Sequence, residues 1–262
     1  MGNENDWPMS LKDHFACYVI NLDASTERWH RIDQHLQSLS ISAKRISAVY
    51  AADLSKQDIL RHYKPELNQQ QFFMPLKPAE IGCFMSHLKT LETFLNQCDK
   101  PYAVILEDDV EFVGDVNQFY AQWLAAMQTD KPVMLKLYAR RSVSGKVFYH
   151  DQGQSIIHPR LVPLGTQACV INRAAAQQLL KVWYQFGMPV DVAYQHYWQH
   201  GVKVLVTVPN HINEISAQVG GSNIATKQKL PFVYKAKREI KRSLYRFVLS
   251  LKSTYNYWVH LK

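Results

Sequence analysis

Hydrophobic and polar positions along this chain alternate with two periods, one typical of strands and one typical of helices. Short apolar runs rich in β-branched and aromatic residues predict strands at 16–22, 43–47, 102–106, 133–137, 165–171 and 202–206. Apolar residues at helical spacing predict helices at 25–39, 53–62, 78–96, 116–127, 173–182 and 190–200. Turn-forming residues predict loops at 65–75 and 209–224, and a hairpin with loops at 140–163. This order predicts an α/β fold that begins with a βαβ unit.

The composition is that of a globular chain that can bury a sizeable core. The chain has 262 residues, of which 47% are hydrophobic and 12% aromatic. Its cysteines are widely spaced, which favours buried free thiols over a zinc cluster (Cys17, Cys83, Cys98 and Cys169). The first fourteen residues lack the apolar segment of a signal peptide, and no stretch has the length of a membrane span. We therefore expect a cytoplasmic protein.

The net charge of +8 is concentrated at the C-terminal end. Residues 227–262 hold ten Lys or Arg and one acid, which leaves twenty basic and twenty-one acidic residues for 1–226. Within this tail, apolar residues recur at helical spacing (Ile240, Leu244, Phe247, Val248 and Leu251). Basic residues occupy the other faces (Lys237, Arg238, Lys241, Arg242 and Arg246). The sequence thus predicts a main domain at 1–226 and a basic amphipathic helix within 227–262.

Three roles are open for this tail. It could pack its apolar stripe on the main domain and expose its charges to water. It could lie on an anionic membrane, where each basic residue contributes about 1 kcal/mol and Tyr255, Tyr257 and Trp258 reach headgroup depth. Nucleic-acid binding is the least favoured role, because the chain carries no recognised nucleic-acid fold signature.

Three adjacent carboxylates follow the predicted strand at 102–106, namely Glu107, Asp108 and Asp109. Burying such a cluster is costly unless a cation or hydrogen-bond donors offset the charge. In open α/β sheets, ligands collect at the carboxyl ends of parallel strands, where these acids would lie. A hard divalent cation is one explanation. A solvated loop, or a helix start capped by an Asp, is the other.

Two further segments accompany the acids in a fixed order. Ile20, Asn21 and Leu22 end the first strand and precede Arg28, and a later segment reads Glu-Ile-Gly-Cys-x-x-Ser-His over 80–87. With the Leu-Glu-Asp-Asp-Val run at 106–110, these motifs resemble glycosyltransferase family 25, the lipopolysaccharide and collagen galactosyltransferases. The resemblance extends over roughly residues 15–224. It implies a GT-A-like fold, which is a Rossmann-like mixed sheet flanked by helices.

The resemblance also implies a metal site for Mn²⁺ or Mg²⁺. Asp109 would be the direct ligand, and Asp108 would contact the ribose or the metal. Glu107 would help to position these two aspartates without binding the metal directly. A residue far along the chain often completes the metal sphere in this fold, and His211 is the candidate, although a surface-loop histidine is the alternative.

A UDP-sugar donor would contact residues of all the motifs. These are Asn21, Leu22, Arg28, Ala48, Glu80, Ser86, His87 and Thr166. Arg28 would bind phosphate, Ala48 and the neighbouring Val49 would border uracil, and Gly82 would permit close backbone approach. The alternatives are an exposed Arg28 and a Ser86 that is merely packed.

Asp191 is the candidate general base, because the resembling family has an Asp at this place. A carboxylate within hydrogen-bond reach accepts the proton of a sugar hydroxyl. The alternative is that Asp191 only caps the helix that it opens.

The family likeness implies a bacterial enzyme that moves galactose from UDP-galactose onto a lipooligosaccharide or lipopolysaccharide, with inversion. The acceptor would be a glycolipid, and the enzyme would be peripheral on the cytoplasmic face of the inner membrane. The chain has Cys169 where an aromatic residue is common, which leaves donor and acceptor choice open. Two other classes also stay open: a metal-dependent phosphodiesterase and a non-catalytic glycan- or lipid-binding protein.

Overall fold

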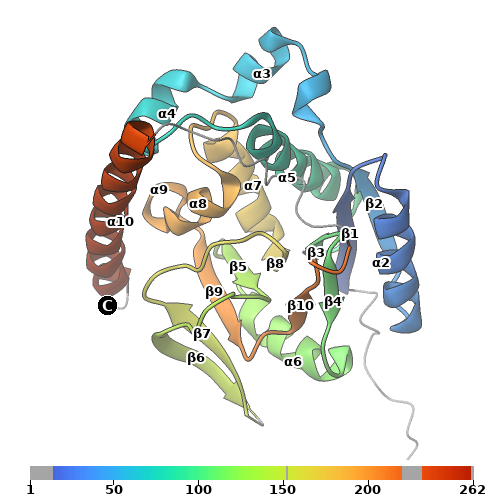
Figure 1. The fold of residues 1–262 in the computed structure, drawn as a ribbon. Coiled ribbons are helices and arrows are strands. Elements are labelled where there is room, and N and C mark those ends of the chain that lie inside the picture. The colour runs from blue at the N-terminus through green and yellow to red at the C-terminus, as the bar shows by residue number, and fades with distance from the viewer. Residues whose placement is uncertain (1–13, 152, 220–231, 261–262) are drawn as a thin grey trace, which may run out of the picture.

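The computed structural model of the chain describes residues 14–151, 153–219 and 232–260, and these residues form one mixed sheet between layers of helices (Figure 1). The sheet has eight strands in the order β2-β1-β3-β8-β5-β9-β7-β6. Their bounds are β1 (Phe15–Asn21), β2 (Ala43–Ser47), β3 (Tyr102–Glu107), β5 (Val133–Lys136), β6 (Gly145–Asp151), β7 (Gln154–Pro159), β8 (Ala168–Asn172) and β9 (Lys203–Val208). A second, two-stranded sheet pairs β4 (Val110–Phe112) with β10 (Ile212–Glu214).

The first three strands of the sheet order run parallel, as the predicted βαβ start requires. In register, Ile20 of β1 lies opposite Glu107 of β3, and Asn21 lies opposite Ser47 of β2. The carboxyl ends of these strands therefore meet at one edge of the sheet. The acids that follow β3 begin at that edge.

Helices cover both faces of the sheet. Their bounds are α2 (Thr26–Ser38), α3 (Lys56–His62), α4 (Pro65–Gln71), α5 (Pro78–Gln97), α6 (Val116–Met127), α7 (Arg173–Trp183), α8 (Val190–Gln195), α9 (Tyr197–His200) and α10 (Phe232–His260), with a 3₁₀ turn at Ala51–Asp53. Successive strand residues point to opposite faces, so Tyr18 and Ile20 join the cluster that contains Phe84 of α5. Val19 joins the other cluster, with Ile32 of α2.

Helix α5 shows how local sequence determines an element next to the acids. Pro78 occupies the first turn, and the Glu80 carboxylate accepts a hydrogen bond from the Lys77 backbone N–H at 2.7 Å. At Gly82, an added Cβ would lie 2.4 Å from the Val49 carbonyl oxygen. The close backbone approach predicted for Gly82 is therefore present, and it brings α5 against the loop that follows β2.

Two predicted segments differ from the observed ones, and a third agrees with them. Residues 65–75 contain helix α4, so the predicted loop was wrong. Pro65 begins this helix, and the buried Asn68 side chain donates to the carbonyls of Met74 (2.9 Å) and Gly187 (2.8 Å). The helix expected over 190–200 divides at His196 into α8 and α9. The predicted hairpin exists as β6 and β7, which form the edge of the sheet farthest from β2.

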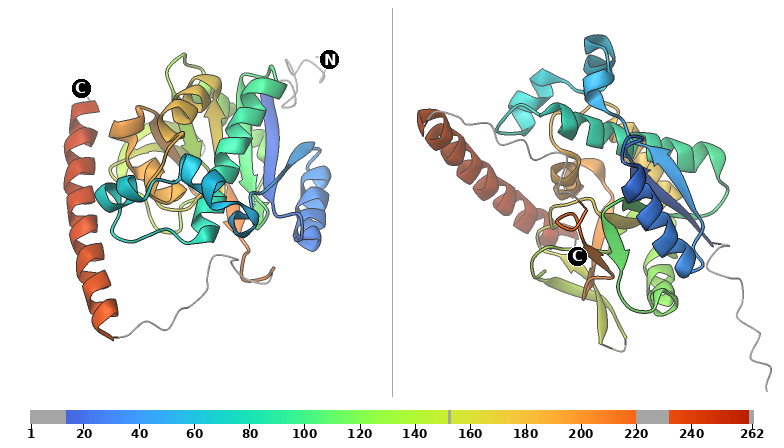
Figure 2. Two further views of the ribbon diagram at one scale, coloured as in Figure 1. Left: turned by 90° about the horizontal axis from the view of Figure 1, so that it is seen from above. Right: turned by 45° about the vertical axis from the view of Figure 1, so that its right-hand side comes forward.

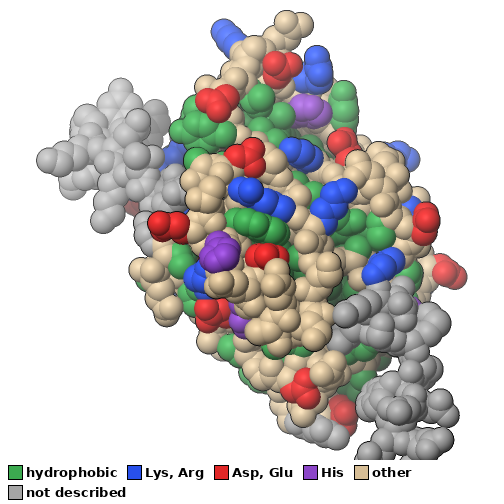
Figure 3. All heavy atoms as spheres, turned by 90° about the vertical axis from the view of Figure 1, so that its right-hand side faces the viewer, with side chains coloured by type: hydrophobic (Ala, Val, Ile, Leu, Met, Phe, Trp, Pro, Cys, Tyr) green, Lys and Arg blue, Asp and Glu red, His purple; other side chains and the backbone are tan. Residues whose placement is uncertain are grey.

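The C-terminal helix α10 lies along the flank of the molecule, beside α4 and the α8–α9 segment (Figure 2). The expected domain boundary at residues 226 and 227 lies outside the described residues. Among the helices that the structure describes, none combines the length and the apolar character needed to cross a bilayer. On the face of the molecule drawn in Figure 3, basic and acidic side chains are interspersed, which agrees with the near-neutral composition of 1–226.

Candidate active site

Asp108 and Asp109 lie just beyond β3, where Asn21 and Arg28 contact their carboxylates. The Asn21 amide donates to Asp108 Oδ2 at 2.6 Å. Arg28, in the first turn of α2, places its guanidinium 2.6 Å from Asp108 Oδ1 and 3.0 Å from Asp109 Oδ2. Arg45 of β2 donates to the side-chain oxygen Oδ1 of Asn21 at 2.9 Å and 2.6 Å, which fixes the orientation of that amide. The carboxyl ends of β1, β2 and β3 thus converge on two carboxylates.

The charge of Asp109 is only partly offset by these contacts. Its Oδ1 is buried and accepts no hydrogen bond within the described part of the chain. Burial, followed by the charge of Glu107, raises the pKa of Asp109 to about 7. Burial also raises the pKa of Asp108. A buried carboxylate oxygen without a donor, beside a second carboxylate, suits a hard divalent cation.

Glu107 faces the other side of the site, toward helix α5. It accepts a hydrogen bond from the Thr166 hydroxyl, and the His87 Nε2 lies 4.0 Å from its Oε1. Burial acts to raise the pKa of Glu107, but interactions with His87 and Thr166 outweigh it and lower the pKa. Cys83, His87 and Glu107 also bring potential ligand atoms within 4.8 Å of one another. Sequence reasoning did not identify Cys83 as part of this cluster.

Asp191 opens α8 and binds the turn between β7 and β8. Its Oδ1 accepts the Val192 N–H at 2.8 Å, and its Oδ2 accepts the Gly165 N–H at 3.3 Å. Burial raises the pKa of Asp191, whereas the nearby charge of Lys136 lowers it. The next residue after Gly165 is Thr166, so one short segment connects Asp191 with Glu107.

Lys136 is a buried cation of the site that sequence reasoning missed. Its side chain is 3% exposed at the end of β5, and its Nζ donates to the carbonyl oxygens of Pro163 (2.7 Å) and Gly165. Burial lowers the pKa of Lys136 to about 8. A lysine inside an apolar strand sequence, Val-Met-Leu-Lys, was the available signal, because lysine is rarely buried without partners.

His211, the predicted distant metal ligand, packs its ring against helix α6. Its ring is fully buried, stacks on Phe119 at 3.7 Å between centroids, and accepts a hydrogen bond from Trp123 at 2.9 Å. Its Nε2 is buried and has no hydrogen-bond partner among the described residues. The apolar surroundings of α6 thus give the His211 ring a packed position, and its role as a metal ligand stays a prediction.

The segment after His211 nevertheless returns to the acids. Glu214 of β10 lies opposite Val110 in register, and the Ile215 N–H donates to the Asp109 carbonyl oxygen at 2.8 Å. The charge of Glu214 contributes to the raised pKa of Asp109. Arg140 donates to Glu214 at 2.7 Å and holds the pKa of Glu214 below its usual range, although burial acts in the opposite direction. Glu214 is therefore the distant residue that the topology brings to this edge.

The other predicted donor-binding residues lie around the same strand ends. Ser86 is buried, donates to the Gly82 carbonyl and accepts the Val49 N–H at 2.8 Å, so it holds the loop after β2. The Ala48 N–H donates to the Asn21 carbonyl oxygen at 2.9 Å, and the Leu22 carbonyl accepts from Arg45 at 3.3 Å. Glu80 caps its own helix, as described above. These contacts are internal, and they position the strand ends that line the site.

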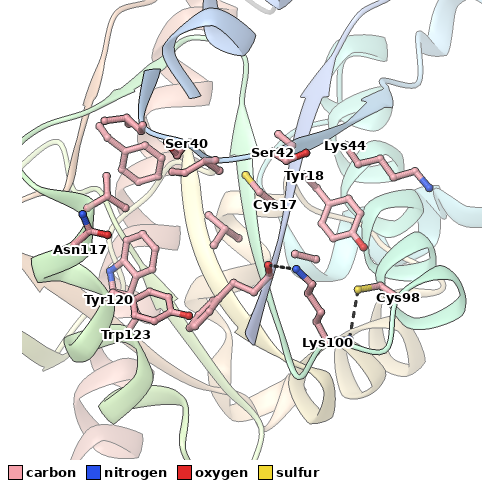
Figure 4. Close-up of a pocket in the computed structure, with 18 of the residues that line it drawn as sticks. Cys17, Tyr18, Ser40, Ser42, Lys44, Cys98, Lys100, Asn117, Tyr120 and Trp123 are labelled. Carbon is pink, nitrogen blue, oxygen red and sulfur yellow. Dashed lines mark hydrogen bonds between the residues drawn. The ribbon is translucent and has the colours of Figure 1, made fainter. Parts of the chain in front are cut away.

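A separate pocket of about 950 Å³ lies at the opposite end of the sheet (Figure 4). Phe15 begins β1 there, and Lys100 Nζ donates to the Phe15 carbonyl oxygen at 3.2 Å. Tyr120 and Trp123 of α6 form part of its wall. Because the acids follow the carboxyl end of β3, this pocket is distinct from the candidate active site.

Fold and site together define an α/β protein of GT-A-like architecture, with carboxylates at the carboxyl end of a central strand. The sequence model of glycosyltransferase family 25, described as an LPS biosynthesis protein, matches residues 14–194. That stretch is more than half of the chain and includes Asn21, Asp109 and Asp191. The chain therefore belongs to glycosyltransferase family 25.

Individual relatives match over shorter stretches. A glycosyltransferase 25 family member of Anopheles gambiae is 30% identical over 98 residues, and procollagen galactosyltransferase 1-B of Xenopus laevis is 28% identical over 98 residues. Each match covers 36% of this chain and 16% of the relative, so the matched stretch is a small part of these longer proteins. A solved structure of a Drosophila β1,4-galactosyltransferase 7 mutant with manganese, UDP-Gal and xylobiose aligns at a TM-score of 0.41 and 10% identity. That alignment covers 86% of this chain and 79% of the other.

Proposed function

We propose that this chain transfers galactose from UDP-galactose to a hydroxyl group of a lipid-linked glycan, with inversion at the anomeric carbon. One observation carries the proposal: Asn21 and Arg28 hold Asp108 and Asp109 at the joined carboxyl ends of parallel strands, and one buried Asp109 oxygen accepts no hydrogen bond in the described chain. Family membership and the similarity to procollagen galactosyltransferase 1-B support the choice of sugar.

Several residues of the chain would have separate roles in such a transfer. Asp108 and Asp109 would hold Mn²⁺ or Mg²⁺, which when bound neutralises the charge that grows on the leaving diphosphate. Arg28 supplies a fixed cation beside them, and a guanidinium forms paired hydrogen bonds with phosphate. Asn21 keeps Asp108 oriented, because its own carbonyl is fixed by Arg45.

Asp191 is the proposed base. Its carboxylate is held by two backbone N–H groups, and burial keeps its pKa above the ordinary value of an aspartate. A base with a raised pKa accepts a proton from a sugar hydroxyl more readily than an ordinary aspartate. The contact with the Val192 N–H is compatible with this role, because it occupies Oδ1, whereas Oδ2 accepts, among the described residues, the Gly165 N–H at 3.3 Å.

Lys136→Met tests how this base is supported. We expect the free energy of unfolding to fall by about 1–3 kcal/mol, because the Pro163 and Gly165 carbonyls lose their donor. The charge of Lys136 lowers the pKa of Asp191, so its removal raises that pKa and moves the acidic limb of the pH–rate profile to higher pH. Urea unfolding and initial rates across pH measure the two effects. Lys131→Met, at an exposed lysine, is the control. If the acidic limb of Lys136→Met stayed at the wild-type pH, the proposed effect of Lys136 on the pKa of Asp191 would be contradicted.

The donor is tested with a panel of UDP-sugars. We expect UDP release with a glycan acceptor to require Mn²⁺ or Mg²⁺, to stop with chelator, and to favour UDP-galactose. A metal-dependent phosphodiesterase would instead cleave a simple phosphodiester without a sugar nucleotide, and Cys83, His87 and Glu107 are the group that could hold a second ion for it. A non-catalytic protein would bind glycan without metal and release no UDP. Either of those results would refute the transferase proposal.

A further inference from the structure

Helix α10 is attached to the rest of the molecule by one face. Tyr245, Leu249, Ser253 and Tyr257 recur every four residues on that face and are buried or half-buried. The Tyr245 ring lies 5.5 Å from the Phe72 ring, and its hydroxyl lies 3.0 Å from His196 Nε2. Ser253 donates to the Arg160 carbonyl at 2.7 Å and accepts from Tyr197 at 2.8 Å through its own carbonyl. This face is therefore a packed contact.

The opposite face of α10 is apolar and exposed. Its side chains are between 41% and 71% exposed (Ile240, Leu244, Phe247, Val248, Leu251, Tyr255, Trp258 and Val259), and together we call them the α10 stripe. At 100° per residue, the centre of the stripe lies roughly 180° from the packed face. The helix thus does not pack its apolar stripe on the described part of the main domain, which was one of the three roles that the sequence left open. Contiguous exposed apolar surface of this kind marks an interaction site.

The charges beside the stripe indicate the partner. Lys241 and Lys252 lie along one edge of it, and both side chains are exposed. Glu239, the acid of this helix, is already paired with Arg238 and Arg242 at 3.2 Å each. The exposed side of α10 therefore combines apolar residues with an excess of positive charge.

We propose that the α10 stripe docks on the surface of an anionic lipid bilayer. From Ile240 to Val259 the stripe is about 28 Å long, which suits a helix lying in the plane of the interface. Its aromatic residues Tyr255 and Trp258 suit headgroup depth, and the neighbouring lysines suit anionic headgroups. A second copy of the chain is the less favoured occupant, because pairing two stripes would bring their positively charged lysines close together, and these charges repel.

Vesicle sedimentation with the full chain tests the proposal. We expect the protein to sediment with vesicles of phosphatidylcholine and phosphatidylglycerol, less with phosphatidylcholine alone, and less at high salt. The double variant Phe247→Glu/Leu251→Glu places two charges in the stripe. Its matched control, Ser243→Glu/Ser250→Glu, adds the same charge at exposed positions outside the stripe. Far-UV circular dichroism verifies that both variants keep the helix.

The two variants give opposite expectations. The stripe variant should bind the mixed vesicles at least about tenfold more weakly than the control does. Equal binding by the two variants would overturn the proposal. Absent vesicle binding, together with a dimer in sedimentation velocity that the stripe variant dissociates, would assign the stripe to a second copy instead. No sugar nucleotide enters this assay, so its failure would leave the proposed transferase activity untouched.

Discussion

Asp109→Asn is expected to lower the rate of sugar transfer by about a hundredfold to a thousandfold. Asparagine keeps the shape of the side chain but removes the charge that would hold a divalent cation beside Asp108. The loss should appear in initial rates at saturating donor and metal. The fold should persist, because Arg28 retains its 2.6 Å contact with Asp108.

The matched control for Asp109→Asn is Glu111→Gln, two residues further along. That substitution removes the same charge and breaks the 2.5 Å ion pair with Arg31, but Glu111 is 41% exposed. A surface ion pair of this kind contributes little to stability. We expect near-normal transfer from Glu111→Gln. Equal rates for both variants would mean that Asp109 does not take part in the chemistry.

Asp191→Asn should lower transfer by about a hundredfold to ten-thousandfold, as expected when a general base is lost. The pH dependence should change as well. Burial raises the pKa of Asp191, so the wild-type rate should fall as pH decreases through a value above the ordinary range of aspartate. That acidic limb should be absent in Asp191→Asn, because no proton binds there.

Asp130→Asn is the comparison for Asp191→Asn, since Asp130 is exposed and distant in sequence from every motif. It should leave both the rate and the acidic limb unchanged. If Asp191→Asn kept an acidic limb like that of the wild type, another group would be the base. If it kept a near-normal rate, Asp191 would have only a structural role in the first turn of α8.

Much of the fold was predictable because its strands and helices carry strong periodic patterns. The parallel β1–β2–β3 unit follows from the apolar runs and the helix between the first two of them. Pro78 marks the start of α5. Helix α4 was not predictable from its Asn- and Gln-rich composition. The short strands β4 and β10 were missed because three residues give too little periodicity, and their pairing depends on distant chain segments.

The site was predictable where several unlike residues are fixed at short spacing. The motif residues Asn21, Arg28, Asp108 and Asp109 do come together. The residues contributed by long-range contacts were not predictable. Glu214 is brought near the acids by the β4–β10 pairing. Lys136, at the end of the central strand β5, binds the carbonyl oxygen of Pro163, which is distant in sequence. His211 was chosen by its residue type, which cannot distinguish a ligand from a ring packed under Trp123. The α10 stripe was predictable as a pattern, but its outward orientation was not.

Calorimetric titration of UDP into the wild type and Asp109→Asn, each with Mn²⁺ and with chelator, tests the central claim most directly. The claim is that the carboxylates held by Asn21 and Arg28 form a metal-dependent nucleoside diphosphate site. We predict binding to the wild type with Mn²⁺, and at least about tenfold weaker binding both with chelator and in Asp109→Asn. UDP binding that is unchanged by the chelator and by the substitution would contradict the claim, as would no binding to the wild type with Mn²⁺.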